Sequence, residues 1–162
     1  MATIKRFEDL ECWQEARGFV SLVYQLIKGE RFRKDFDLIG QVRRSSISSM
    51  ANIAEGFHRN STRDFMRFLD YSRSSIAETM SHFYVALDQK YIDEAEMTQV
   101  KQQADIVWKK LNNFISYLSK QLKHSRDKTN KTNLTNEINK TNKTNKTNST
   151  NKTDERDLSK ER

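Results

Sequence analysis

Proline is absent from this chain of 162 residues, which contains only four glycines and one cysteine. Without proline, no residue forces a helix to break. The single cysteine, Cys12, cannot form an internal disulfide, so a reducing compartment is the simplest expectation. The four glycines are too far apart to build a glycine-rich phosphate loop. Disulfide-stapled folds and P-loop enzymes are therefore excluded, and long helices are favoured.

Long apolar runs are also missing. No stretch approaches the roughly 20 apolar residues that a membrane-spanning helix needs. The first ten residues contain no apolar run of the kind found in signal peptides. We therefore expect a cytoplasmic protein without a membrane partner.

Positive charge is in excess and unevenly distributed along the chain. The formal net charge is +7. Residues 1–124 carry 19 basic and 16 acidic side chains, and residues 125–162 carry 10 basic and 6 acidic ones. This balance permits binding to nucleic acid or to an acidic partner, without identifying either.

Apolar residues at steps of three and four predict four helices. The first covers about 8–28. The second begins at Asp37, an expected N-cap, and ends near Gly56. The third begins at Ser61 and the fourth at Asp93, each followed three residues later by an acidic residue, as in a capping box. Four such helices with short connections predict an all-α, antiparallel, up-and-down four-helix bundle.

The helical periodicity stops at about residue 125, so we expect the bundle to span 1–124. The rest, 125–162, is a low-complexity segment rich in Lys-Thr-Asn repeats. Only Leu134, Ile138 and Leu158 could bury apolar surface there, too little to offset the entropy of ordering the segment. The sequence predicts a disordered tail, which is either a weak basic tether or a repeat expansion without function.

The second helix is unusually poor in charge. Between Asp37 and Glu55 the only charged residues are Arg43 and Arg44. A helix of this kind must be covered on most sides, by the rest of the bundle or by other copies of the chain. The residues expected to serve packing or oligomer contacts are Gln41, Arg43, Ser45, Ser48, Ser49, Asn52 and Glu55.

The basic residues of the middle of the chain suggest a phosphate-binding surface. Every lysine or arginine position in 35–89 is an arginine, whose planar fork binds phosphate in a way that lysine cannot. Arg63 and Arg67 fall nearly opposite the apolar stripe of the third helix. The arginines predicted to contact nucleic acid are Arg44, Arg59, Arg63, Arg67 and Arg73. Asp64 and Asp70 are interleaved with them, so solvated or salt-bridged arginines are the alternative.

Catalytic and metal-binding arrangements have little support. The histidines are scattered, and Cys12 is expected to be a core thiol. Di-metal bundles use Glu-x-x-His on their helices, and Glu55 with His58 has that spacing. However, Glu78 and His82 lie away from the apolar stripe of the third helix and cannot face the same core. We expect no enzyme activity, no metal and no cofactor.

Several short runs carry a family resemblance. They are Phe-Glu-Asp-Leu at 7–10, Gln-Val-Arg-Arg at 41–44, Asn-Ile-Ala-Glu-Gly at 52–56 and Tyr-Ile at 91–92. With these residues the chain resembles, over about 1–122, the four-helix-bundle proteins encoded in intervening sequences of bacterial 23S ribosomal RNA genes. Ser45 and Ser74 depart from the family pattern, which would adjust close packing.

The resemblance implies a bundle that assembles as a homopentameric, barrel-like ring and has no enzymatic activity. It also implies kinship with accessory variability proteins of diversity-generating retroelements, which bind a reverse transcriptase and nucleic acid. We therefore expect a non-enzymatic oligomer whose arginine-rich surface binds RNA, DNA or an enzyme that acts on them. The alternatives are a protein-interaction scaffold without nucleic-acid binding and, as a minor one, a di-metal carboxylate enzyme.

Overall fold

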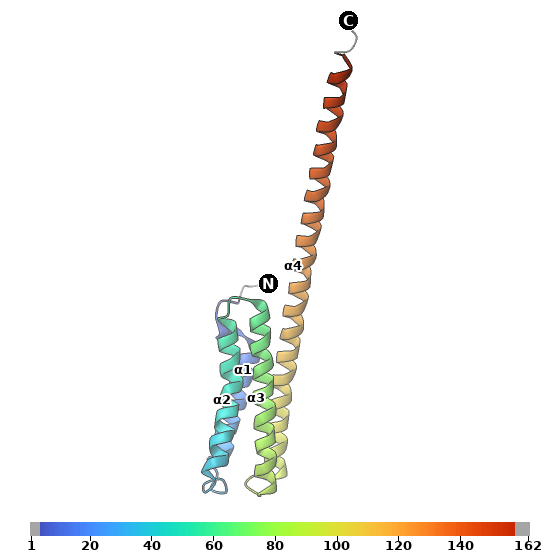
Figure 1. Ribbon diagram of the computed structural model, residues 1–162. Helices are drawn as coiled ribbons and strands as arrows, with labels where there is room; N and C mark the ends of the chain where they lie inside the picture. The colour runs from blue at the N-terminus through green and yellow to red at the C-terminus, as the bar shows by residue number, and fades with distance from the viewer. Residues whose placement is uncertain (1–3, 158–162) are drawn as a thin grey trace. The chain divides into compact units, whose positions relative to one another are not determined.

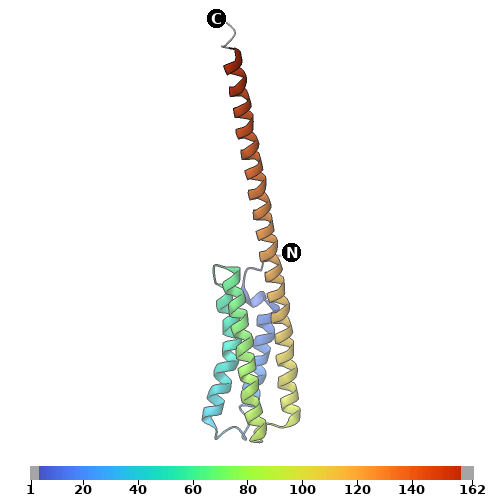
Figure 2. The same ribbon diagram turned by 45° about the vertical axis from the view of Figure 1, so that its right-hand side comes forward.

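The computed structural model describes the backbone of residues 4–157, and within that part the chain contains helices and no strand. The elements are the 3-10 helix η1 (Phe7–Asp9) and the α-helices α1 (Glu11–Leu26), α2 (Phe36–Phe57), α3 (Thr62–Asp88) and α4 (Glu94–Asp157). Contacts divide the chain into two units, Met1–Ser119 and Lys120–Arg162. In the first unit, four helices run side by side in alternating directions (Figures 1 and 2). The predicted all-α four-helix bundle is confirmed.

The start of α2 differs from the prediction by two residues. The carboxylate of Asp35 accepts a hydrogen bond from the backbone N–H of Leu38 at 3.0 Å, so Asp35 is the N-cap. Asp37, the predicted N-cap, lies in the first turn, where a negative charge suits the helix dipole. The predicted N-cap, Asp37, is therefore wrong, and the helix begins two residues earlier.

The starts of α3 and α4 follow the predicted caps. The hydroxyl oxygen of Ser61 accepts a hydrogen bond from the backbone N–H of Asp64 at 3.1 Å. Asp93 and Glu96 form a reciprocal capping box, in which each carboxylate accepts the other residue's backbone N–H, at 2.8 and 2.9 Å. These local bonds satisfy backbone donors that a helix start leaves unpaired.

One apolar core holds the bundle together. Each helix contributes residues at steps of three and four, as the periodicity predicts. The largest fully buried side chains are Phe19, Phe32, Phe83, Ile53, Leu69, Ile76, Met97 and Leu111. α1 is also joined to α4 by polar contacts, because Lys110 Nζ lies 2.6 Å from Glu11 Oε2, and this hydrogen bond lowers the pKa of Glu11.

Gly56 serves close packing and is not the left-handed helix cap that its position suggested. No described glycine has a positive φ, and α2 continues to Phe57. A Cβ atom at residue 56 would lie 2.6 Å from Phe68 Cβ and 2.8 Å from Phe65 Cδ2. These distances are shorter than carbon atoms tolerate, so only glycine lets the start of α3 approach α2 so closely.

In the second unit the structure describes the backbone of residues 120–157, which is helical. The backbone of α4 continues as helix to Asp157, whereas the sequence predicts a disordered tail from 125. No proline or glycine interrupts this stretch. The apolar residues singled out there, Leu134, Ile138 and Leu158, lie outside the residues whose side chains the structure describes, as do most of the Lys-Thr-Asn repeats. An isolated helix without an apolar stripe is marginal in water.

Candidate assembly and nucleic-acid interface

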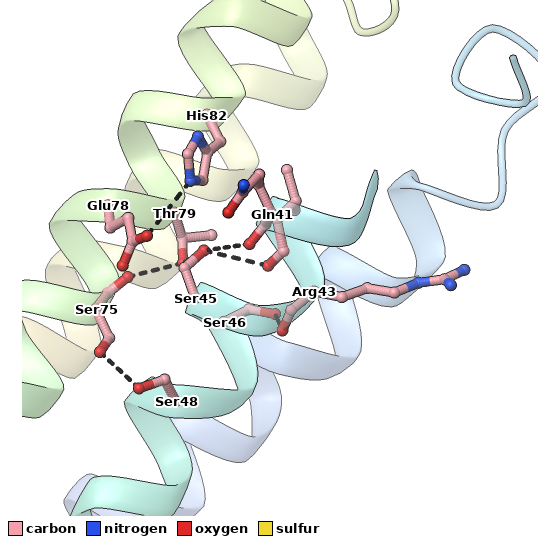
Figure 3. A network of polar contacts seen from close by, with 10 residues as sticks. Gln41, Arg43, Ser45, Ser46, Ser48, Ser75, Glu78, Thr79 and His82 are labelled. Atoms are coloured by element: carbon pink, nitrogen blue, oxygen red, sulfur yellow. Dashed lines mark hydrogen bonds and ion pairs between the residues drawn. The ribbon is translucent and has the colours of Figure 1, made fainter. Parts of the chain in front are cut away.

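Hydroxyl side chains fill the contact between α2 and α3 (Figure 3). We call this contact the serine seam, and its members are Ser45, Ser48, Ser49 and Asn52 of α2 and Ser72, Ser75 and Thr79 of α3. Thr79 Oγ1 lies 2.9 Å from Ser45 Oγ, and Ser75 Oγ lies 3.0 Å from Ser48 Oγ. Because these side chains are short, the two helices can approach closely along the seam.

The buried hydroxyls of the seam are satisfied without charged partners. Ser45 Oγ donates to the carbonyl oxygen of Gln41 at 3.0 Å, within its own helix. Ser72 Oγ donates across the seam to the carbonyl oxygen of Ser49 at 2.6 Å. Ser45 is 2% exposed and Ser49 is 0% exposed. Ser45 and Ser49 therefore pack within one chain, and both are too deeply buried to reach a second copy.

Ser48 and Asn52 lie half-buried at the edge of the seam. Asn52 Nδ2 donates to the carbonyl oxygen of Ser48 at 2.9 Å and lies 3.5 Å from Ser75 Oγ. The two side chains thus link α2 to α3 and are still reachable from outside the bundle.

The side of α2 that points away from the core is open. We call it the α2 outer face; its members lie on one side of the helix and are Gly40, Gln41, Arg44, Ile47, Ser48, Ala51 and Glu55. Ile47 is 40% exposed. In the part of the chain that the structure describes, no ion pair or hydrogen bond involves the guanidinium of Arg44. A single bundle therefore covers only one side of this charge-poor helix.

The remaining packing or oligomer candidates divide between two places. Gln41 and Glu55 lie on the outer face, and Glu55 forms an ion pair with Arg59. Arg43 lies on the flank toward α1, where its guanidinium stands 5.7 Å from the ring centroid of Tyr24. Arg43 is exposed and does not need the buried carboxylate or carbonyl partner that a covered position would require.

Three of the predicted phosphate-binding arginines lie in the turn after α2 and in the first two turns of α3. This arginine cluster consists of Arg59, Arg63 and Arg67. Arg59 pairs with Glu55 and stands 4.5 Å from the ring centroid of Phe68. Arg67 Nη2 lies 2.9 Å from Asp64 Oδ1. Arg63 is exposed and has no ion-pair partner among the described residues.

The other two predicted arginines lie elsewhere. Arg44 belongs to the α2 outer face. Arg73 turns toward α4, where its guanidinium stands 5.1 Å from the ring centroid of Trp108 and Nη1 lies 3.0 Å from Asp70 Oδ1. The five arginines therefore do not form one surface. Periodicity within single helices could not show this, because it does not say which helix lies next to which.

Several of the residues considered for catalysis and metal binding are ion-paired or buried. Among the described residues, no three histidine, cysteine or acidic side chains gather as a metal site. The carboxylate of Glu55 is held by Arg59, and His82 Nε2 lies 3.7 Å from Glu78 Oε1. Burial raises the pKa of Cys12 to about 11, so its thiol stays protonated and unreactive at neutral pH.

Sequence reasoning missed a groove between α3 and α4. Its volume is about 650 Å³, and its lining residues are Ile76, Ala77, Met80, Ser81, Tyr84, Lys101, Ala104, Asp105 and Trp108. The available signal was a second set of large side chains, Met80, Tyr84 and Trp108, beside the core stripes of the two helices. Among residues 4–157, no helix combines the length and apolar character needed to cross a bilayer.

The sequence profile described as 23S rRNA-intervening sequence protein matches residues 8–113, from the 3-10 helix through most of the bundle part of α4. The chain belongs to this family. The predicted family resemblance is confirmed, whereas the relation to retroelement accessory proteins stays a prediction. No curated protein matches the chain.

A solved structure has the same fold. It is the crystal structure of a protein of unknown function from the S23 ribosomal protein family of Bacteroides thetaiotaomicron. The identity is 22%, the match covers 64% of this chain and 97% of the other, and the TM-score is 0.58. At this identity the likeness concerns the fold alone.

Proposed function

We propose that this 23S rRNA-intervening sequence protein is a non-enzymatic, ring-like oligomer that binds nucleic acid, or an enzyme acting on it, through its arginines. Family resemblance suggests a pentamer, and a reverse transcriptase is the enzyme class that it suggests as a partner. The open outer face of α2 carries the proposal.

The case for an oligomer rests on the composition of that face. Residues 38–54 of α2 contain only two charged residues, Arg43 and Arg44, although the chain as a whole is 31% charged, and the outer face exposes Ile47 among small residues. Exposed apolar and small surface with few charges favours contact with another protein. A contact between two different patches of identical chains repeats from copy to copy and closes into a ring when the rotation permits.

The case for nucleic acid rests on the arginine cluster. The ion pairs of Arg59 and Arg67 are exposed and bridge neighbouring residues. Pairs of this kind contribute only about 0–1 kcal/mol, so phosphate can replace the carboxylate at little cost. Arg63 is free of such a pair among the described residues and is the best single phosphate ligand of the cluster.

Binding of the full chain to single- and double-stranded RNA and DNA tests the proposal, with salt varied from 50 to 200 mM. Arg63→Ala/Arg67→Ala should weaken binding and reduce the slope of log affinity against log salt by about 2, one for each lost phosphate contact. Lys109→Ala/Lys120→Ala removes the same charge from exposed positions of α4 and should change the slope less. Equal effects of the two double variants would remove the cluster as the binding site.

The oligomer is tested separately by light scattering. We expect a mass near five times the 19.2 kDa of one chain. A monomer at micromolar concentration would exclude the ring.

The second candidate is a protein-interaction scaffold without nucleic-acid binding. Three of the five arginines already have acidic partners, which favours this reading. A protein partner that is retained at high salt while no RNA is retained would support it.

A further inference from the structure

The groove between α3 and α4 has the build of a helix-binding site. Ile76 and Ala104 form its buried floor, and Met80 and Trp108 line it further out. Tyr84 stands at one end and is 49% exposed. Apolar grooves between two helices commonly receive the apolar face of a third helix.

Two opposite charges stand on the α4 side of the groove. Lys101 Nζ lies 5.1 Å from the ring centroid of Tyr84. Asp105 is exposed one turn further along α4, about 6 Å away along the axis. Neither side chain has an ion-pair partner among the described residues. An occupant should therefore present a cation opposite Asp105 and a hydrogen-bond acceptor opposite Lys101.

The α2 outer face carries these groups in the required order. Gln41 supplies an amide oxygen, Arg44 an unpaired cation and Ile47 an apolar side chain, at intervals of about 4.5 Å along the helix. When α2 of a neighbouring copy is laid parallel to α4, Gln41 lies opposite Lys101 and Arg44 lies opposite Asp105.

One turn further along the aligned helices, the contact is apolar. Ile47 lies opposite Ala77 of α3 and Trp108 of α4, which line the two sides of the groove. Gly40, Ser48 and Ala51 are small enough to let the helix backbone approach.

The docking requires α2 of one copy to run parallel to α4 of the next, and a ring provides this orientation. In an up-and-down bundle α2 and α4 run the same way, as Figures 1 and 2 show. A neighbouring copy related by rotation about an axis along the bundle keeps its α2 parallel to the first copy's α4. The face and the groove are different patches of one chain, so their contact is heterologous and leads to a closed ring or an open filament.

We infer that the α2 outer face of one copy docks into the α3–α4 groove of the next copy, with Arg44 paired to Asp105 across the contact. This inference rests on the proposed oligomer and names the two surfaces that build it.

Charge reversal tests the pairing in the full chain. Arg44→Asp or Asp105→Arg alone places like charges opposite each other and should raise the dissociation constant of the oligomer roughly tenfold or more. The double variant Arg44→Asp/Asp105→Arg should restore assembly, as measured by sedimentation velocity. Lys109→Glu and Asp88→Arg reverse exposed charges outside both surfaces and should leave the oligomer unchanged.

Disulfide trapping tests the geometry independently, because the native Cys12 is buried. The pair Ile47→Cys/Ala77→Cys should give a ladder of cross-linked chains under oxidation, and Ile47→Cys alone should give none. Dimers from Ile47→Cys alone would show that α2 meets α2 and would overturn the inference.

The possible failures are distinguishable. If the oligomer forms and neither charge reversal affects it, the docking surfaces are wrong and the proposed ring stands. If the unmodified chain is a monomer, the ring fails and the inference fails with it.

Discussion

On the side of α2 that faces α3, Ser45 and Ser49 are buried and hydrogen-bonded, whereas on the opposite side Arg44, Ile47 and Ala51 are exposed. Both sides contain small residues, and the outer side also carries the larger side chains of Arg44 and Ile47. On the inner side, small size permits the close approach of α3, and hydroxyls find backbone carbonyls nearby. On the outer side, no other helix of the same chain covers these residues. The low charge of α2 therefore has two consequences. Inside the bundle it permits the contact with α3, and outside the bundle it leaves the α2 outer face open for a contact with another molecule.

Among the predictions for the contact between α2 and α3, the largest loss of stability is expected from a substitution of Gly56. Gly56→Ala should destabilise the bundle by about 1–3 kcal/mol, because the added Cβ would collide with Phe68 and Phe65. Urea denaturation at one fixed chain concentration measures the change. Gly40→Ala, on the outer face, is the matched control when both variants are compared as monomers: only the flexible end of Arg44 lies within 4 Å of its Cβ, so it should stabilise the single bundle by up to about 1 kcal/mol. Equal effects at the two glycines would contradict the contrast between the two sides.

Removing one hydroxyl from the serine seam should have an intermediate effect. Thr79→Val keeps the shape of the side chain and deletes the contact with Ser45 Oγ, at an expected cost of about 1 kcal/mol. Thr98→Val removes an exposed hydroxyl that bonds only within its own helix, and should stay within about 0.5 kcal/mol. Thermal unfolding of both variants gives the comparison. A neutral Thr79→Val would mean that the seam acts through small size alone.

The smallest effect is expected from the tail. A chain ending at residue 124 should unfold within about 0.5 kcal/mol of the full chain, because the tail has no apolar stripe to pack. Far-ultraviolet circular dichroism distinguishes a disordered tail from a continuation of the α4 helix. If it is disordered in solution, truncation leaves the helical signal per molecule nearly unchanged. A loss in proportion to the residues removed would mean that α4 keeps its full length without packing.

Local features of the fold were predictable where a single motif decided them. Ser61 and Asp93 each precede an acidic residue at the right spacing, and both cap a helix as expected. The N-cap of α2 was predicted at Asp37, and the hydrogen bond from the backbone N–H of Leu38 places it at Asp35. Gly56 was noticed for the wrong reason, since the phenylalanines that require it come from the next helix.

The candidate site was predictable in its ingredients and not in its arrangement. Composition singled out the serines and the arginines, but Ser49 faces α3 and Arg73 faces Trp108, away from the arginine cluster. The α3–α4 groove escaped notice because Tyr84 and Lys101 become neighbours only when two helices pack together.

By itself, the sequence determined that this chain is all-α, where its helices lie, and that its second helix differs from the others in charge. These properties depend on periodicity and capping, which involve residues a few positions apart. The tertiary structure alone decided which serines are buried, why Gly56 must be glycine, and which side of α2 stays open. Those properties depend on contacts between helices that are distant in the chain, and no local pattern specifies them.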